Sequence, residues 1–109
     1  MSYHKMRAMR LLDSQIASIR TIVPQYAGKG CRVYLFGSRL DDAARGGDVD
    51  LLIETPQQLP LMQRVRMKMA IEAALGLPVD LVVREENQTP TAFQRLAKLR
   101  STLLMDEGA

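Results

Sequence analysis

Apolar residues recur at three- and four-residue steps in three stretches of the chain. This spacing places them on one face of a helix, and it predicts helices over residues 11–27, 60–75 and 91–104. Pro24 is expected to kink the first helix or to end it early. The residues that carry the pattern are Leu12, Ile16, Ile19, Val23 and Tyr26 in the first helix, Leu61, Val65, Met69 and Ala73 in the second, and Phe93, Leu96, Arg100 and Leu103 in the third.

Shorter apolar stretches between these helices predict three strands, over residues 31–36, 49–54 and 79–83. The resulting order, α-β-β-α-β-α, indicates an α/β (α+β) domain in which helices cover a sheet. The second and third strands are joined through a helix, so they are expected to be parallel if they are neighbours. Only a loop joins the first two strands, which leaves an antiparallel pairing open for them.

Composition narrows the class of protein. The chain has 109 residues, which predicts a single domain over residues 1–109. Apolar residues make up 47% and charged residues 25%, a globular composition. No apolar run approaches the roughly 20 residues that span a bilayer, and no secretory signal is recognisable, so no membrane partner is expected. Cys31 is the only cysteine, which favours a cytoplasmic protein without disulfides.

The net charge of +3 is unevenly distributed. Residues 1–30 contain five bases and one acid, a net charge of +4, which leaves −1 for the rest of the chain. Two interpretations remain open. The bases can form a solvated helix face, or they can form a docking surface for an acidic partner or RNA.

Three aspartates carry the candidate chemistry. Asp48 and Asp50 lie two residues apart at the start of a predicted strand, and in extended backbone such residues point to the same side with Cα atoms about 6.5–7 Å apart. Such a pair can share one or two divalent cations, and Mg²⁺ suits carboxylates combined with substrate phosphates. Asp80 lies in the next strand among apolar neighbours, where a carboxylate is costly unless something satisfies it. If the two strands are adjacent and in register, Asp80 joins the same cluster.

A short Gly-Ser segment follows the first predicted strand. Gly37 lets a ligand approach the backbone closely, Ser38 offers a hydroxyl and an N–H, and Arg39 adds positive charge. Gly-Ser alone is a common turn, and Asp-x-Asp alone is a common end of a solvated loop. Together with an aspartate inside an apolar strand, they indicate phosphoryl or nucleotidyl transfer, in which positioning and charge neutralisation supply most of the catalysis.

The segments 35–39, 47–53 and 79–82 resemble the Gly-Ser, Asp-x-Asp and third-carboxylate motifs of the DNA polymerase beta superfamily. The resemblance covers roughly residues 10–105. It implies the nucleotidyltransferase fold, a small mixed sheet of three to four strands packed by helices. The chain's size resembles the minimal nucleotidyltransferase (MNT) branch, whose members look like antitoxins paired with HEPN-domain ribonuclease toxins.

The resemblance also implies roles for the site residues. Gly37 and Ser38 would hold the triphosphate of ATP, and Arg39 would contact a phosphate. Asp48 and Asp50 would coordinate two Mg²⁺ ions. Asp80 would complete the second metal site and help to deprotonate the acceptor hydroxyl.

The implied reaction transfers AMP from ATP to a tyrosine hydroxyl on a partner HEPN toxin and thereby neutralises it. A hetero-oligomer with the toxin and no direct contact with nucleic acid are expected. Two alternatives remain open. The protein can be a non-catalytic antitoxin that acts by steric contact through its basic first helix or its last helix. It can also modify a small molecule or an RNA, although such enzymes usually carry a second domain for the acceptor.

Overall fold

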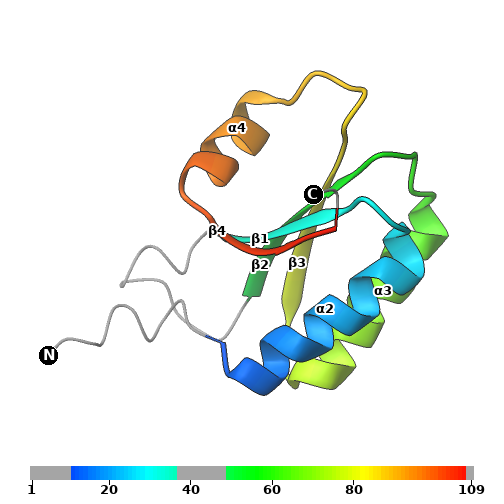
Figure 1. Ribbon diagram of the computed structural model, residues 1–109, viewed down its shortest axis with the longest axis vertical. Helices are drawn as coiled ribbons and strands as arrows, with labels where there is room; N and C mark the ends of the chain where they lie inside the picture. The colour runs from blue at the N-terminus through cyan, green and yellow to red at the C-terminus, as the bar shows by residue number, and fades with distance from the viewer. Residues whose placement is uncertain (1–10, 37–48, 108–109) are drawn as a thin grey trace, which may run out of the picture.

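A mixed four-stranded sheet with helices on both faces forms the part of the chain that the structure, a computed structural model, describes: residues 11–36 and 49–107 (Figure 1). The strand order is β3-β2-β1-β4, with β1 antiparallel to β2 and β4, and β2 parallel to β3. The predicted fold class is confirmed. The elements are α2 (Asp13–Ala27), β1 (Arg32–Phe36), β2 (Val49–Thr55), α3 (Leu61–Leu75), β3 (Val79–Glu85), α4 (Ala92–Leu99) and β4 (Thr102–Asp106).

The two faces of the sheet are covered unequally. Helices α2 and α3 lie side by side on one face, and the Gln15 side chain at the start of α2 donates to the Leu75 carbonyl at the end of α3 (3.2 Å) (Figure 1). The main core forms between these helices and the sheet. On the other face, the shorter α4 covers a second, smaller cluster of Tyr34, Phe36, Leu52 and Ala97. Because β2 is central and covered from both sides, all seven of its residues are buried.

Helix α2 forms much as its apolar pattern predicts. Ile19 and Val23 are fully buried, whereas Leu12 precedes the helix and is exposed. Pro24 lies inside α2 and does not end it early, since the helix continues to Ala27. The chain then turns at Gly28, whose positive φ of 81° favours glycine and whose N–H donates to the Pro24 carbonyl.

Helix α3 presents a different face to the core than its predicted stripe. Leu61 and Met69 from that stripe are exposed, whereas Met67, Ile71 and Leu75 are buried. Both rows repeat every four residues, so the helical period alone cannot choose between them. Packing against α2 and the sheet selects the second row, and the first row remains on the surface.

The predicted helix over residues 91–104 is wrong in its second half. Helix α4 ends at Leu99, and residues 102–106 form strand β4. Thr91 begins α4 with a reciprocal cap, in which its hydroxyl accepts from the Gln94 N–H and the Gln94 side chain accepts from the Thr91 N–H. Strand β4 forms because it pairs with β1, about seventy residues earlier in the chain, and local periodicity carries no information about that partner.

Cys31 lies just before β1 and is fully buried in the main core. Burial raises the pKa of its thiol, and the nearby negative charge of Glu107 raises this pKa further. Since the thiolate is the reactive form, this cysteine is expected to be inert in the folded protein. Among the described helices, none is both long and apolar enough to cross a membrane.

We expect Cys31 to react with iodoacetamide only when the chain unfolds. Alkylation in native buffer should proceed roughly 10³-fold more slowly than in guanidinium chloride, in line with the small unfolded fraction of a stable domain. Mass spectrometry of timed aliquots measures both rates. Equal rates in the two solvents would show that the thiol is accessible in the folded state.

Candidate functional site

On the face covered by α4, the side chains of β1, β2 and β3 form three rows across the sheet. Residues paired in neighbouring strands point to the same face, so the strand register defines each row. The row at one end of this face contains two acidic residues, the middle row is apolar, and the row at the other end is a network of charged residues. The rows are Phe36, Asp50 and Asp80, then Tyr34, Leu52 and Val82, and finally Arg32, Glu54 and Arg84.

The first row brings two of the predicted carboxylates together. Strands β2 and β3 are adjacent and parallel, and Asp50 is paired directly with Asp80, which puts their Cα atoms about 4.8 Å apart. The conditional expectation that Asp80 lies beside Asp50 is therefore confirmed. Asp50 is 8% exposed, whereas Asp80 is exposed. The expectation of a costly buried carboxylate at Asp80 is wrong, because β3 is an edge strand with one side open to solvent.

This carboxylate pair has the chemistry of a divalent-cation site. Two like charges at this separation repel one another, and a cation between them removes the repulsion. Carboxylate oxygens are also the hard donors that Mg²⁺ prefers, so Asp50 and Asp80 fit this ion. Within residues 11–36 and 49–107, no three His, Cys, Asp or Glu side chains are grouped to hold a metal. The remaining predicted ligand, Asp48, lies outside the described residues.

The predicted phosphate-binding residues Gly37, Ser38 and Arg39 also lie outside the described residues. Phe36 immediately precedes them in the sequence, and it is paired with Asp50 in the first row. The Gly-Ser segment therefore follows directly from the strand end that lies beside the carboxylate pair.

A groove of about 280 Å³ lies between α3 and the edge strand β3. Asp80 contributes to one wall, and the cationic residues Arg64 and Lys68 of α3 contribute to the other. Asp80 is thus reachable from solvent, and two positive charges line the same groove.

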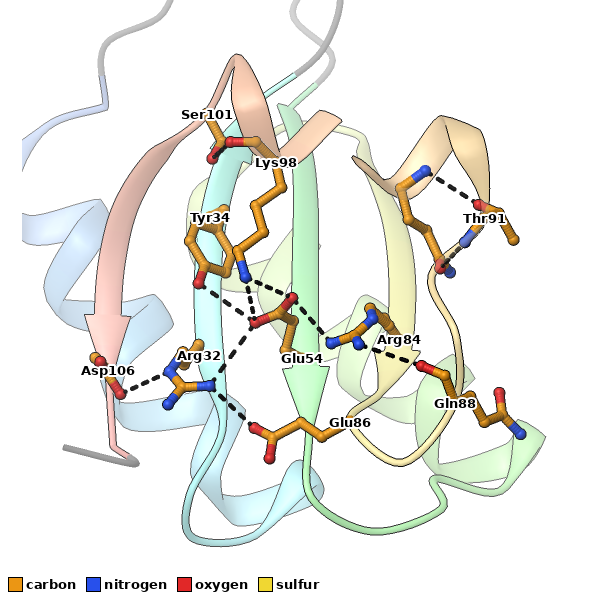
Figure 2. A network of polar contacts seen from close by, with 11 residues as sticks. Arg32, Tyr34, Glu54, Arg84, Glu86, Gln88, Thr91, Lys98, Ser101 and Asp106 are labelled. Carbon is orange, nitrogen blue, oxygen red and sulfur yellow. Dashed lines mark hydrogen bonds and ion pairs between the residues drawn. The ribbon is translucent and has the colours of Figure 1, made fainter. Parts of the chain in front are cut away.

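Glu54, in the third row, is a buried charge that the sequence analysis did not single out. It is 1% exposed, and its carboxylate accepts from Arg84 Nη1 (3.2 Å) and from the Tyr34 hydroxyl (3.3 Å) (Figure 2). Lys98 Nζ lies 3.2 Å from Oε2, and Arg32 Nη1 lies 3.9 Å from Oε1. The available sequence signal was its position four residues after Asp50, which places both acids on one face of a central strand.

This Glu54 network attaches α4 to the sheet. Lys98 is the α4 residue that reaches Glu54, and its ammonium group also lies 5.4 Å from the centre of the Tyr34 ring. Nearer the carboxylate pair, Phe93 of α4 packs edge-to-face on Phe36, with ring centres 5.9 Å apart. Burial and the charge of Glu54 raise the pKa of Tyr34, while Lys98 lowers it, so the hydroxyl keeps the proton that it donates to Glu54.

Comparison with known proteins identifies the class to which this fold and site belong. A family model described as a nucleotidyltransferase domain matches residues 16–102, and the chain therefore belongs to this family. Among the curated proteins, none matches the sequence.

Solved structures of similar fold include chains from two toxin–antitoxin complexes. One is the tri-AMPylated HEPN toxin of Shewanella oneidensis in complex with its MNT antitoxin (20% identity, 84% of this chain and 70% of that chain, TM-score 0.65). The second is a toxin–antitoxin complex with AMP-PNP (21% identity, 87% and 74%, TM-score 0.69). A third similar structure is described as a minimal nucleotidyltransferase (22% identity, 94% and 98%, TM-score 0.62). At these identities the likeness establishes the fold.

We expect Glu54→Gln to lower the free energy of unfolding by about 2 kcal/mol, the loss of charge-assisted hydrogen bonds to cations that remain partly open to solvent. The substitution keeps the shape of the side chain but leaves Arg84 and Lys98 without their buried counter-charge. Urea unfolding followed by circular dichroism measures the change. As a control, Glu85→Gln in β3 should change stability by less than about 0.5 kcal/mol. Equal effects of the two substitutions would contradict a special role for Glu54.

Proposed function

We propose that this protein is a Mg²⁺-dependent nucleotidyltransferase antitoxin that transfers AMP from ATP to a tyrosine hydroxyl of a partner HEPN toxin. The observation that carries the proposal is the direct pairing of Asp50 with Asp80 at one end of the sheet, in a chain of the nucleotidyltransferase family. One of these carboxylates is buried and the other is exposed. The proposed site therefore combines a buried carboxylate, Asp50, with an exposed carboxylate, Asp80, that an acceptor can reach.

Similar structures support the choice of nucleotide and partner. One contains an AMPylated HEPN toxin with its MNT antitoxin, and another contains AMP-PNP in a toxin–antitoxin complex. Transfer of AMP to a protein partner is the reaction that accounts for an AMPylated toxin. The assignment of the acceptor as tyrosine rests on the resemblance in the sequence motifs.

The residues have separate roles in this proposal. Gly37, Ser38 and Arg39 hold the triphosphate, and Asp48, Asp50 and Asp80 hold Mg²⁺, which neutralises phosphate charge when it is bound. Asp80 also helps to accept the proton of the tyrosine hydroxyl, since it is the exposed member of the pair. The hydroxyl oxygen then bonds to the α-phosphorus of ATP, the bond from this phosphorus to the bridging oxygen breaks, and pyrophosphate leaves.

We expect Asp50→Ala and Asp80→Ala each to reduce transfer of label from α-labelled ATP to the co-expressed toxin by at least about 100-fold. Each variant removes a carboxylate that positions and neutralises the reacting groups. Autoradiography of the separated proteins measures the transfer, and addition of EDTA should abolish it in the unsubstituted protein. As a control, Asp13→Asn removes an exposed carboxylate from α2, on the opposite face of the sheet, and should leave transfer unchanged.

Two outcomes would contradict this function. Full transfer by the Asp50→Ala/Asp80→Ala double variant would exclude a catalytic role for the pair. Protection of cells by the same variant, in an intact complex with unmodified toxin, would instead indicate an antitoxin that acts by steric contact.

A further inference from the structure

Asp50 and Asp80 determine the side from which an acceptor must approach. Their row faces the side of the sheet that carries α4, whereas α2 and α3 cover the opposite side. Asp80 lies on an edge strand and also lines the groove beside α3, whereas Asp50 lies on the central strand and faces the α4 side. If both carboxylates act on a protein hydroxyl, as the proposed function requires, a partner against the α4 side of the sheet is the one that reaches both of them. Among the helices and strands that the structure describes, α4 therefore presents its exposed surface to the approaching partner.

The contacts of α4 with the sheet show which side of the helix faces the carboxylate pair and which side faces Glu54. Lys98 reaches Glu54 in the third row, at the end of the face away from the carboxylate pair (Figure 2). Leu96 lies about 160° around the helix axis from Lys98, so it is on the opposite flank. Phe93 contacts Phe36, which belongs to the same row as Asp50 and Asp80. The flank that contains Phe93 and Leu96 is thus turned toward the carboxylate end.

That flank is apolar and open to solvent. Phe93, Leu96 and Leu99 follow one another at three-residue steps and span about 120° of the helix surface. Their exposed fractions are 56%, 51% and 82%. Leu103 of β4, which shares the α4 side of the sheet with its partner Tyr34, is 49% exposed. Four exposed large apolar side chains on the same side of the sheet as the carboxylate pair are typical of an interaction surface.

The charges of α4 indicate the chemistry of the partner. Residues 92–100 contain Arg95, Lys98 and Arg100 and no carboxylate. Lys98 is paired with Glu54, whereas Arg95 and Arg100 are exposed beside the apolar flank. A complementary surface has an apolar centre that covers the leucines and acidic residues at its rim.

We propose that the α4 flank, defined as Phe93, Leu96, Leu99 and Leu103, is the docking surface for an acidic, apolar face of the toxin that carries the acceptor hydroxyl. Docking there places the acceptor beside Asp50 and Asp80 and adds a wall to those that residues 11–36 and 49–107 build around the reaction site. The inference rests on the proposed function, because it assumes a protein acceptor.

Helix α3 provides a matched control surface. Met62 and Met69 are also exposed apolar residues that are not among those lining the groove at Asp80, and Arg66 is an exposed cation between them. They lie on a helix that packs against the opposite face of the sheet, so a partner bound there does not cover the row that contains Asp50. Substitutions on α3 therefore change surface hydrophobicity and charge to a similar degree without altering the proposed docking surface.

The test compares Leu96→Glu/Leu99→Glu with Met62→Glu/Met69→Glu, each in the full chain. We expect the α4 variant to bind the toxin at least about 10-fold more weakly and to lose AMP transfer in proportion, while the α3 variant behaves as the unsubstituted protein. Arg100→Ala should weaken binding more than Arg66→Ala, with a smaller dependence on salt than the unsubstituted protein shows. Isothermal titration with the toxin measures affinity, and titration with Mg²⁺-ATP confirms that both variants still bind nucleotide.

The outcomes separate the inference from the proposed function. Loss of binding in the α3 variant alone would overturn the α4 surface while leaving AMP transfer intact as the activity. A dimer of the isolated chain that Leu96→Glu/Leu99→Glu dissociates would show that a second copy covers the flank, and it would also overturn the inference. Transfer that persists in Asp50→Ala/Asp80→Ala would refute the proposed function, whatever the α4 variants do.

Discussion

The parallel pairing of β2 with β3 determines the rest of the functional face. The register that aligns Asp50 with Asp80 also aligns Leu52 with Val82 and Glu54 with Arg84. A shift of one residue in β3 would turn Asp80 toward α2 and α3 and separate it from Asp50. The alternation of side chains along the strands therefore makes one register responsible for the acidic row, the apolar row and the charged network together. The helical crossover through α3 allows this pairing, since parallel neighbours need a long connection.

Glu54 attaches α4 to the sheet at the end of the functional face that lies away from Asp50 and Asp80. Helix α4 has eight residues, too few to be stable by itself, and Ala97 is its only buried residue. Its position depends on the ion pair of Lys98 with Glu54 and on the contact of Phe93 with Phe36. A buried carboxylate is costly, but several donors offset that cost. The network defines where α4 lies, and α4 then forms one side of the candidate site.

The surface of the molecule is consistent with a site completed by another protein. The described part of the chain provides a sheet end with two carboxylates, and a short helix with an exposed apolar flank beside it. A second apolar row, with Leu61 and Met69, lies on α3. These two surfaces border opposite faces of the sheet. The α4 surface lies on the face of both carboxylates, whereas the α3 row reaches only the groove at Asp80, through Leu61. The surface proposed for docking is distinguished by the face of the sheet on which it lies, more than by its hydrophobicity.

Local sequence patterns determined most of the elements and the chemistry. Apolar periodicity was sufficient for α2, α3 and the first three strands, because each of these signals lies within one segment. The spacing of the Gly-Ser and aspartate motifs likewise indicated the nucleotidyltransferase family. Three features depended on contacts between distant segments: strand β4, whose partner β1 is far away in sequence, the choice of the Met67 row as the buried face of α3, and the exposure of Asp80 on an edge strand. Periodicity identifies which residues share a face, but the packing of distant elements decides which face is buried.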